Sequence, residues 1–219
     1  MSLWPTSKLR RVRLNSEETP VPGTAGYAEA ADSLVESYES ISFEAIYRPL
    51  LDILPQGGCA LDIGAGTGRD AAALAARGFR VHAAEPTAEL RAHARRLHPS
   101  PAITWIEDAL PDLAGLHARG IRFDLILMTA VWMHLDREER GKAFPRVADL
   151  LVPGGRLFMT VRSGPVPPGR RMFHVPTDEL VVAAENIGLR VLRNYDFPDM
   201  LGRQDVSWTM LAFERENRV

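Results

Sequence analysis

The residues best suited to chemistry lie in a glycine-rich turn that follows a buried apolar strand. The segment reads Leu-Asp-Ile-Gly-Ala-Gly-Thr-Gly-Arg-Asp over residues 61–70, and an alanine-rich helix follows it. Glycines let a ligand lie against bare backbone, although such turns also serve tight packing. In open α/β sheets the first strand-to-helix turn forms the floor of the ligand site. The turn is therefore the expected floor of a ligand site, where a ligand can lie against the backbone of Gly64, Ala65 and Gly66.

Acidic residues stand where the next two strands are expected to end. Glu85, followed by Pro86, comes 21 residues after Gly64, and an acid at this point can accept both hydroxyls of a ribose. Asp108, followed by Ala109, can accept a hydrogen bond from the exocyclic amine of adenine. Each acid also has a structural alternative, because Glu85 can favour a helix N-terminus and Asp108 can cap a short helix. Their joint occurrence at neighbouring strand ends favours a nucleoside site.

The spacing of the glycines separates two classes of nucleotide-binding protein. A dinucleotide fingerprint has a third glycine three residues after the second, and Arg69 stands at that position. The G-x-G-x-G pattern resembles the class I S-adenosylmethionine (SAM)-dependent methyltransferases. The resemblance continues through residues 123–127, 131–135 and 151–157, and it covers roughly residues 43–213.

That resemblance implies SAM as cofactor, S-adenosylhomocysteine (SAH) as its product, and a role for each residue of the site. It implies that Asp62, Gly64 and Gly66 line the methionine part and that Glu85 holds the ribose. It further implies that Asp108 and Ala109 flank the adenine and that Thr129 lies beneath the sulfonium. The implied fold is α/β, a Rossmann-like three-layer sandwich whose seven-stranded, mostly parallel sheet has an antiparallel last strand.

His134 is the candidate catalytic residue, because a histidine just beyond the fourth strand has a pKa suited to a general base. The alternative is a histidine that caps or packs the following loop. The pair His134-Leu135 is similar to one found after the fourth strand in the branch that includes quinone-biosynthesis methyltransferases. Methyl transfer depends mainly on orientation, so a general base is helpful rather than obligatory.

The acceptor is expected between the N-terminal helices and a proline-stiffened loop at residues 162–174, which is long for its position. Three arginines of this loop can bind an acidic or phosphorylated acceptor, or can simply be solvated: Arg162, Arg170 and Arg171. Four aromatic residues can wall an aromatic acceptor, or can belong to the core: Tyr27, Tyr38, Trp132 and Phe173.

Nucleic acid and metals are not expected as partners. With 26 Lys and Arg against 28 Asp and Glu, the chain has no positive field to attract nucleic acid or an anionic membrane. Residues 129–132 read Thr-Ala-Val-Trp, which differs from the Asn/Asp-Pro-Pro-aromatic motif of amino-methylating DNA enzymes. Cys59 is at the wrong end of its strand for a cytosine C5 enzyme. No His and Cys cluster has zinc spacing. A small-molecule acceptor is therefore expected.

The hydrophobic pattern alternates between short apolar runs and amphipathic helices, as in a parallel sheet covered on both faces. We expect two helices within residues 28–54, then strands at 59–63, 79–84, 103–106, 123–128, 156–161, 189–195 and 207–214. Further helices are expected near 68–77, 88–98, 113–119, 137–151 and 177–187. The last two strands should pair antiparallel. Residues 1–26 are expected to form a mobile tail or lid, and residues 27–219 a single methyltransferase domain.

Two other functions stay open. A cofactor-binding module that regulates a partner without transferring a methyl group would carry the same cofactor residues. A nicotinamide oxidoreductase is opposed by Arg69 and by the terminal antiparallel hairpin. The single cysteine and the lack of a signal or membrane segment predict a cytoplasmic protein. Only Lys8 and Lys142 are lysines among the 26 basic residues, a bias typical of a GC-rich bacterial genome. The oligomeric state, the acceptor and the methylated atom stay open.

Overall fold

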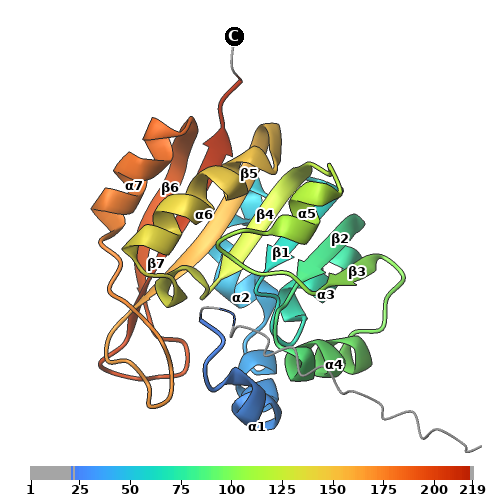
Figure 1. The fold of residues 1–219 in the computed structure, drawn as a ribbon, viewed down its shortest axis with the longest axis vertical. Coiled ribbons are helices and arrows are strands. Elements are labelled where there is room, and N and C mark those ends of the chain that lie inside the picture. The colour runs from blue at the N-terminus through green and yellow to red at the C-terminus, as the bar shows by residue number, and fades with distance from the viewer. Residues whose placement is uncertain (1–20, 22, 218–219) are drawn as a thin grey trace, which may run out of the picture.

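Seven strands form one sheet in the order β3-β2-β1-β4-β5-β7-β6 (Figure 1). The computed structural model describes residues 21 and 23–217. The strands are β1 (Gly58–Ile63), β2 (Phe79–Ala84), β3 (Ile103–Ile106), β4 (Phe123–Thr129), β5 (Leu151–Ser163), β6 (Leu189–Pro198) and β7 (Ser207–Arg215). β7 runs antiparallel to both β5 and β6, whereas the other neighbours are parallel. The predicted fold class is confirmed.

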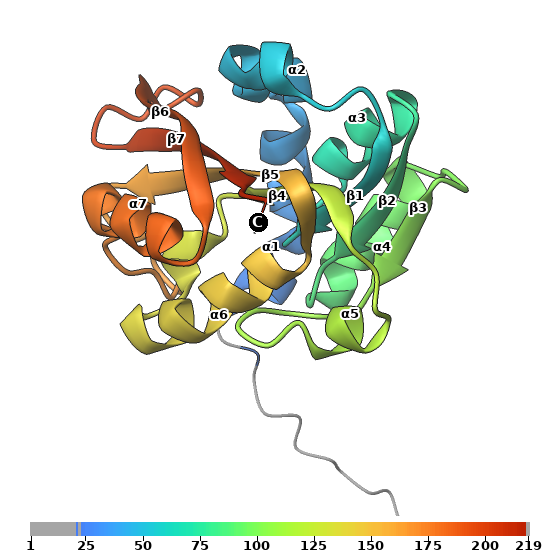
Figure 2. The ribbon, with the colours of Figure 1, turned by 90° about the horizontal axis from the view of Figure 1, so that it is seen from above.

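Helices cover both faces of the sheet, so the central strands are buried on both sides. In β1, every residue from Cys59 to Ile63 is buried. The helices are α1 (Tyr27–Glu39), α2 (Phe43–Tyr47), α3 (Arg69–Ala76), α4 (Ala88–Leu97), α5 (Ala114–Ala118), α6 (Arg137–Asp149) and α7 (Thr177–Asn186). Short 3-10 turns follow α2 at Arg48–Ile53 and β4 at Trp132–His134. Figure 2 shows α2 and α3 on one face, and α5, α6 and α7 on the other.

The helix ends follow local signals in the sequence. Ser42 caps α2 by accepting a hydrogen bond from the amide of Ala45, and Asp136 with Glu139 forms a capping box at α6. Gly78 and Gly188 have φ of 88° and 80° just beyond α3 and α7, as expected of glycines at helix C-termini. β5 begins at Leu151 rather than at 156, because its first residues already pair with β4 before a register shift.

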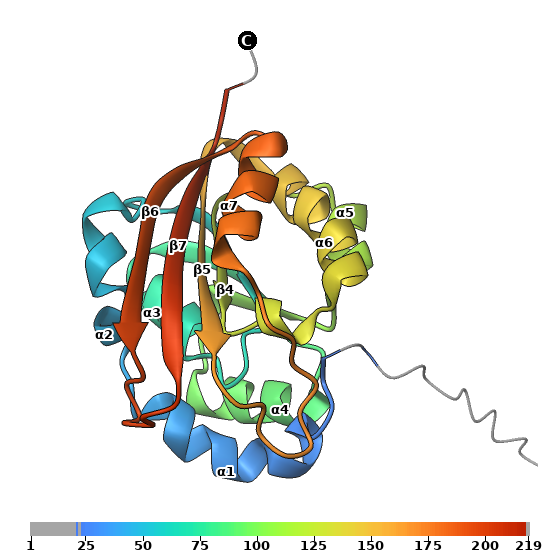
Figure 3. The same cartoon turned by 90° about the vertical axis from the view of Figure 1, so that its left-hand side faces the viewer.

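Helix α1 lies across the carboxyl ends of the strands, next to α4 (Figure 3). His93 of α4 is 2.7 Å from Asp32, and His98 is 3.2 Å from Glu39, so two imidazole–carboxylate contacts join these helices. The expected tail or lid at 1–26 lies mostly outside the described residues. Its last part, residues 23–26, forms the turn that leads into α1. No helix in the described part of the chain is long and apolar enough to cross a membrane.

Candidate active site

A cavity of about 430 Å³ opens at the carboxyl ends of the strands, where α1 and the loops after β4, β5 and β6 meet. All nine predicted cofactor-side residues line it: Asp62, Gly64, Ala65, Gly66, Glu85, Pro86, Asp108, Ala109 and Thr129. His134, Tyr38, Arg162 and Arg170 also line it. The structure therefore brings together residues from six separate segments of the chain, as the strand-end argument predicts.

The glycine turn has a backbone that side chains would obstruct. Gly64 and Gly66 have φ of 69° and 56°, in the left-handed region that favours glycine. A Cβ on Gly64 would lie 2.6 Å from a methyl group of Val131, which is too close without a shift. A Cβ on Gly66 would lie 3.8 Å from the ring of Tyr38 and 4.0 Å from the carbonyl oxygen of Gly64, which are ordinary van der Waals distances. The turn therefore leaves bare backbone on the cavity wall.

The carboxylate of Glu85 holds this turn in place through hydrogen bonds to backbone amides. Its side chain is buried, and its two carboxylate oxygens accept hydrogen bonds of 2.8 Å from the amides of Gly66 and Thr87. Burial raises the pKa of Glu85. Each carboxylate oxygen keeps a second lone pair, so the carboxylate can still accept from a ligand. Glu85 thus joins the glycine turn to the start of α4, so the expected alternative, an acid at a helix N-terminus, is present. Its carboxylate still has the capacity to hold a ribose.

Asp108 is similarly engaged with the backbone. One oxygen accepts from its own neighbour Ala109 at 2.9 Å, and the other accepts from Leu116 at 2.8 Å. Leu116 lies in the first turn of α5, so Asp108 caps that helix. The capping alternative is therefore present in the structure, and a bond to adenine would have to use the remaining lone pairs.

A buried polar cluster beneath the cavity leaves one carboxylate oxygen unpaired. Asp70 accepts from Arg69 at 2.7 Å and from the hydroxyl of Thr129 at 2.6 Å, and Tyr47 contacts the same hydroxyl at 2.5 Å. Asp62 is 1% exposed, and its Oδ2 has no hydrogen-bond partner. Burial, and then the charge of Asp70, raise the pKa of Asp62 well above its usual range. A ligand with an ammonium group would satisfy Asp62.

Sequence reasoning missed the parts that Asp70 and Tyr47 play in this cluster. Asp70 resembles an ordinary acid in the first turn of a helix, and Tyr47 resembles a core aromatic at helical spacing. Nothing in the local sequence indicates that both converge on Thr129.

His134 is held in one tautomer. Its Nδ1 lies 2.8 Å from the carbonyl oxygen of Arg171, and a carbonyl can only accept, so Nδ1 carries the hydrogen. Nε2 is then a bare acceptor, 3.0 Å from the hydroxyl of Tyr27, which donates to it. Burial lowers the pKa of His134, and burial followed by Tyr38 raises that of Tyr27. A neutral imidazole whose Nε2 lone pair already accepts from a hydroxyl can take the proton of that hydroxyl, as a general base requires.

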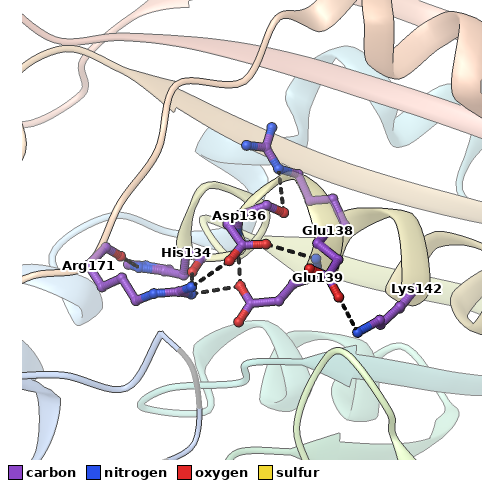
Figure 4. Close-up of polar contacts among 7 residues, drawn as sticks. His134, Asp136, Glu138, Glu139, Lys142 and Arg171 are labelled. Carbon is purple, nitrogen blue, oxygen red and sulfur yellow. Dashed lines mark hydrogen bonds and ion pairs between the residues drawn. The ribbon is translucent and has the colours of Figure 1, made fainter.

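Arg171 fixes the loop that orients His134, as Figure 4 shows. Its guanidinium is 3.0 Å from Asp136 and 2.7 Å from Glu139, and it also donates to the carbonyl of His134 at 2.7 Å. Arg171 is not among the residues that line the cavity. Its charge is used within the protein, so it is not the acceptor-binding arginine that the loop composition allowed.

Arg170 holds the segment that precedes α1. Its guanidinium stacks 4.0 Å from the centre of the Tyr27 ring and donates to the carbonyl of Ala25 at 3.2 Å. On the other side of this segment, a Cβ on Gly23 would lie 2.7 Å from Cβ of His134. Residues 23–27 are therefore packed between Arg170 and His134.

The position of Trp132 corrects the expectation that this residue walls the acceptor. Trp132 is 1% exposed, packs against Phe144 with ring centres 5.0 Å apart, and is absent from the cavity lining. Phe173 also lies outside the lining and stacks on Arg171. An aromatic residue in the sequence suits the core as well as a cavity wall, so the sequence pattern alone does not distinguish the two positions.

The loop between β6 and β7 supplies a wall that sequence reasoning did not assign. Asp199 accepts from Arg203 at 2.6 Å, from Nε1 of Trp208 at 2.9 Å and from the amide of Leu201 at 3.0 Å. The hydrogen bonds from Arg203, and then from Trp208, hold the pKa of Asp199 well below its usual range. All four residues line the cavity. In the described part of the chain, no three His, Cys, Asp or Glu side chains are grouped so that they could hold a metal ion.

Residues 60–155 match the family model of a methyltransferase domain. This stretch of the chain is therefore similar to a methyltransferase domain. The matched region begins in β1 and ends in β5, so it contains the glycine turn, both strand-end acids and Thr129. No curated protein sequence matches the chain.

Solved structures share the fold over most of the chain. The 1,6-didemethyltoxoflavin-N1-methyltransferase of Burkholderia thailandensis, with bound 1,6-didemethyltoxoflavin and SAH, is 20% identical at a TM-score of 0.66, over 87% of this chain and 86% of that one. A TehB-like SAM-dependent methyltransferase from Corynebacterium glutamicum is 21% identical, with a TM-score of 0.61, over 86% of this chain and 99% of that one. Magnesium protoporphyrin IX methyltransferase from Synechocystis PCC 6803, with bound SAM, is 17% identical at 0.59, over 87% and 80%. These structures share the Rossmann-like fold that the glycine pattern predicts.

Proposed function

We propose that this protein transfers the methyl group of SAM to a small-molecule acceptor bound in the same cavity. The observation that carries the proposal is the continuity of that cavity. The glycine turn and strand-end acids line one part of it, and His134, Tyr27 and Arg162 line another. Its volume of about 430 Å³ lies in the range of small-ligand pockets. A cofactor and an acceptor can therefore meet in one enclosed space.

The cofactor half offers a matching partner for each part of SAM. The unpaired carboxylate of Asp62 suits the methionine ammonium, and the bare backbone of Gly64, Ala65 and Gly66 suits its close approach. We assign the ribose to Glu85, the adenine to Asp108 with Pro86 and Ala109, and the floor beneath the sulfonium to Thr129. The bound cofactor supplies an activated methyl carbon, so the protein mainly orients the nucleophile, which can lower a barrier by about 7–11 kcal/mol.

We assign His134 the role of general base, acting through Tyr27. The Tyr27 oxygen can accept a proton from the acceptor while its own proton passes to Nε2 of His134, 3.0 Å away. The hydrogen bond from Nδ1 to the Arg171 carbonyl holds the imidazole ready for this transfer. Positioned bases contribute roughly 100-fold to 10,000-fold to a rate.

The cavity walls favour a flat acceptor. Tyr27, Tyr38, Phe197 and Trp208 all line it, and aromatic faces pack well against planar rings. Because of the pair His134-Leu135, we propose that the protein belongs to the methyltransferase branch that includes the quinone-biosynthesis enzymes. The arginine bias and the single buried Cys59 support a bacterial, cytoplasmic protein. We retain residues 27–219 as one methyltransferase domain.

Calorimetry with SAM, SAH and NAD tests the cofactor assignment. We expect micromolar binding of SAM and SAH and much weaker binding of NAD, and tighter binding of NAD would overturn it. Radiolabelled SAM, offered with a panel of phenols and small acids, then tests methyl transfer. Tight SAM binding with no transfer to any acceptor would favour the non-catalytic, regulatory module instead.

A further inference from the structure

Arg162 is a buried arginine that faces the acceptor part of the cavity. It lies at the carboxyl end of β5, pairs in register with Trp208 of β7, and is 9% exposed. β5 and β7 are adjacent along their length (Figure 3). Both side chains line the cavity. A guanidinium in this position is largely removed from water.

The other arginines at this end of the sheet have partners within the protein. Arg69 pairs with Asp70, Arg171 with Asp136 and Glu139, and Arg203 with Asp199. Arg170 stacks on Tyr27 and donates to a backbone carbonyl. Each of these guanidinium groups is therefore used in holding a loop or helix in place.

Arg162 differs from them. Among the described residues it forms no salt bridge, and its one hydrogen bond goes from Nη1 to the carbonyl of Gly164 at 3.3 Å. Its Nε is buried without a partner. The nearby Asp199 is already occupied by Arg203, Trp208 and Leu201. Burial, and then the charge of Arg203, lower the pKa of Arg162. A buried charge without a counter-ion is costly, so an anionic ligand would stabilise this site.

We infer that the acceptor is an aromatic carboxylic acid whose carboxylate binds Arg162. This inference rests on the proposed function. A guanidinium binds a carboxylate through two parallel hydrogen bonds. Among the described residues, Nη2 of Arg162 has no hydrogen-bond partner, and Nη1 has only the 3.3 Å bond to the carbonyl of Gly164. The rings of Trp208 and Phe197, stacked with centres 6.4 Å apart, form the wall beside it. An aryl acid satisfies both the unpaired cation and the aromatic wall.

The carboxylate of the cofactor is a less suitable partner for Arg162. β4 separates β5 from the glycine turn at the end of β1. Two strand spacings amount to about 10 Å, which places Arg162 on the acceptor side of Thr129. The experiment below distinguishes these two carboxylates directly.

The test compares wild type with Arg162→Gln and with a matched control, Arg193→Gln. Arg193 is an exposed arginine of the edge strand β6, and it pairs with Asp52. The control therefore removes the same charge at a position away from the cavity. Binding of 4-hydroxybenzoate, phenol and phenyl phosphate is measured by calorimetry, with and without saturating SAH. We expect 4-hydroxybenzoate to lose at least tenfold in affinity in Arg162→Gln alone, while phenol binding stays the same in all three proteins.

Melting curves show whether Arg162 has a structural role, because loss of a structural residue would lower the melting temperature. Arg162→Gln should melt no lower than wild type, because it removes an unpaired buried charge, and 4-hydroxybenzoate should raise the melting temperature of wild type only. A marked drop in melting temperature, or carboxylate binding that does not depend on Arg162, would overturn the inference. Tighter binding of phenyl phosphate, or an equal loss of SAH affinity in Arg162→Gln, would also overturn it. Failure of wild type to bind SAH would instead contradict the proposed function. The two failures can be told apart, because acceptor binding measured without SAH tests Arg162 on its own.

Discussion

Tyr27 and His134 lie 107 positions apart in the sequence and share a hydrogen bond of 3.0 Å. Tyr27 is the first residue of α1, and His134 ends the 3-10 turn after β4. The two rings meet edge to face, with centres 5.4 Å apart. The proposed base is thus completed by a residue of the N-terminal segment, and its chemistry depends on how that segment is docked.

Tyr27→Phe tests this relay. The change removes the hydroxyl but keeps the ring on which Arg170 stacks. We expect kcat to fall by at least tenfold, while SAH affinity stays within about twofold, because proton transfer is lost and the cofactor half is untouched. Steady-state kinetics and calorimetry on the same preparation measure both. Tyr195→Phe is the control, since Tyr195 is 40% exposed and outside the cavity lining. An unchanged kcat would assign the proton to another acceptor.

The stability of the protein should depend on pH through His134. Burial lowers the folded-state pKa of His134 below 6.5, so below pH 6.5 the unfolded chain takes up a proton that the folded protein does not. The stabilising contribution is therefore present above 6.5 and is lost as the pH falls toward the folded-state value. Urea unfolding at about pH 7.5 and about pH 5.5 should show a larger loss for wild type than for His134→Gln. Equal losses would mean that His134 takes up its proton as readily in the folded protein as in the unfolded chain.

Glu85→Ala should damage both the fold and cofactor binding. It leaves the amides of Gly66 and Thr87 without their acceptor, and unsatisfied buried donors cost about 1–3 kcal/mol each. We expect a clear drop in the free energy of unfolding and at least a tenfold loss of SAH affinity. Glu107→Gln, which removes a mostly exposed partner of Arg91, should change neither greatly. Normal SAH binding in Glu85→Ala would show that the ribose lies elsewhere.

Gly23→Ala should disturb the acceptor half selectively. Gly23 has φ of 85°, and an added Cβ would lie 2.7 Å from Cβ of His134, so the segment before α1 must move. We predict a severalfold lower kcat, with SAH affinity unchanged. Gly120→Ala is the matched control, because Gly120 also has a positive φ, of 65°, and nothing lies within 4 Å of a Cβ there. Equal kcat in the two variants would contradict the packing of Gly23 against His134.

Strand and helix positions could be predicted because each depends on local periodicity and caps. The strands around 79–84 and 103–106 are confirmed at both ends, and Gly78 and Gly188 stand where helix C-termini were expected. Which side chains face the cavity depends on contacts between distant segments. Trp132 and Tyr47 have similar local patterns, yet Trp132 packs into the core while Tyr47 reaches Thr129.

The same distinction separates the arginines of the site. Arg162, Arg170 and Arg171 are equivalent as residue types in one loop region, and only tertiary structure gives two of them partners. Asp199 shows the same limit, because its contacts with Arg203 and Trp208 form only when β6 and β7 pair.

Helix α1 covers both halves of the site. Tyr38 near its end lies over Gly66, and Tyr27 at its beginning closes on His134. A single helix therefore borders both the proposed cofactor half and the proposed acceptor half. A displacement of α1 would uncover both halves together, so a variant that loosens α1 should affect cofactor exchange and acceptor entry alike.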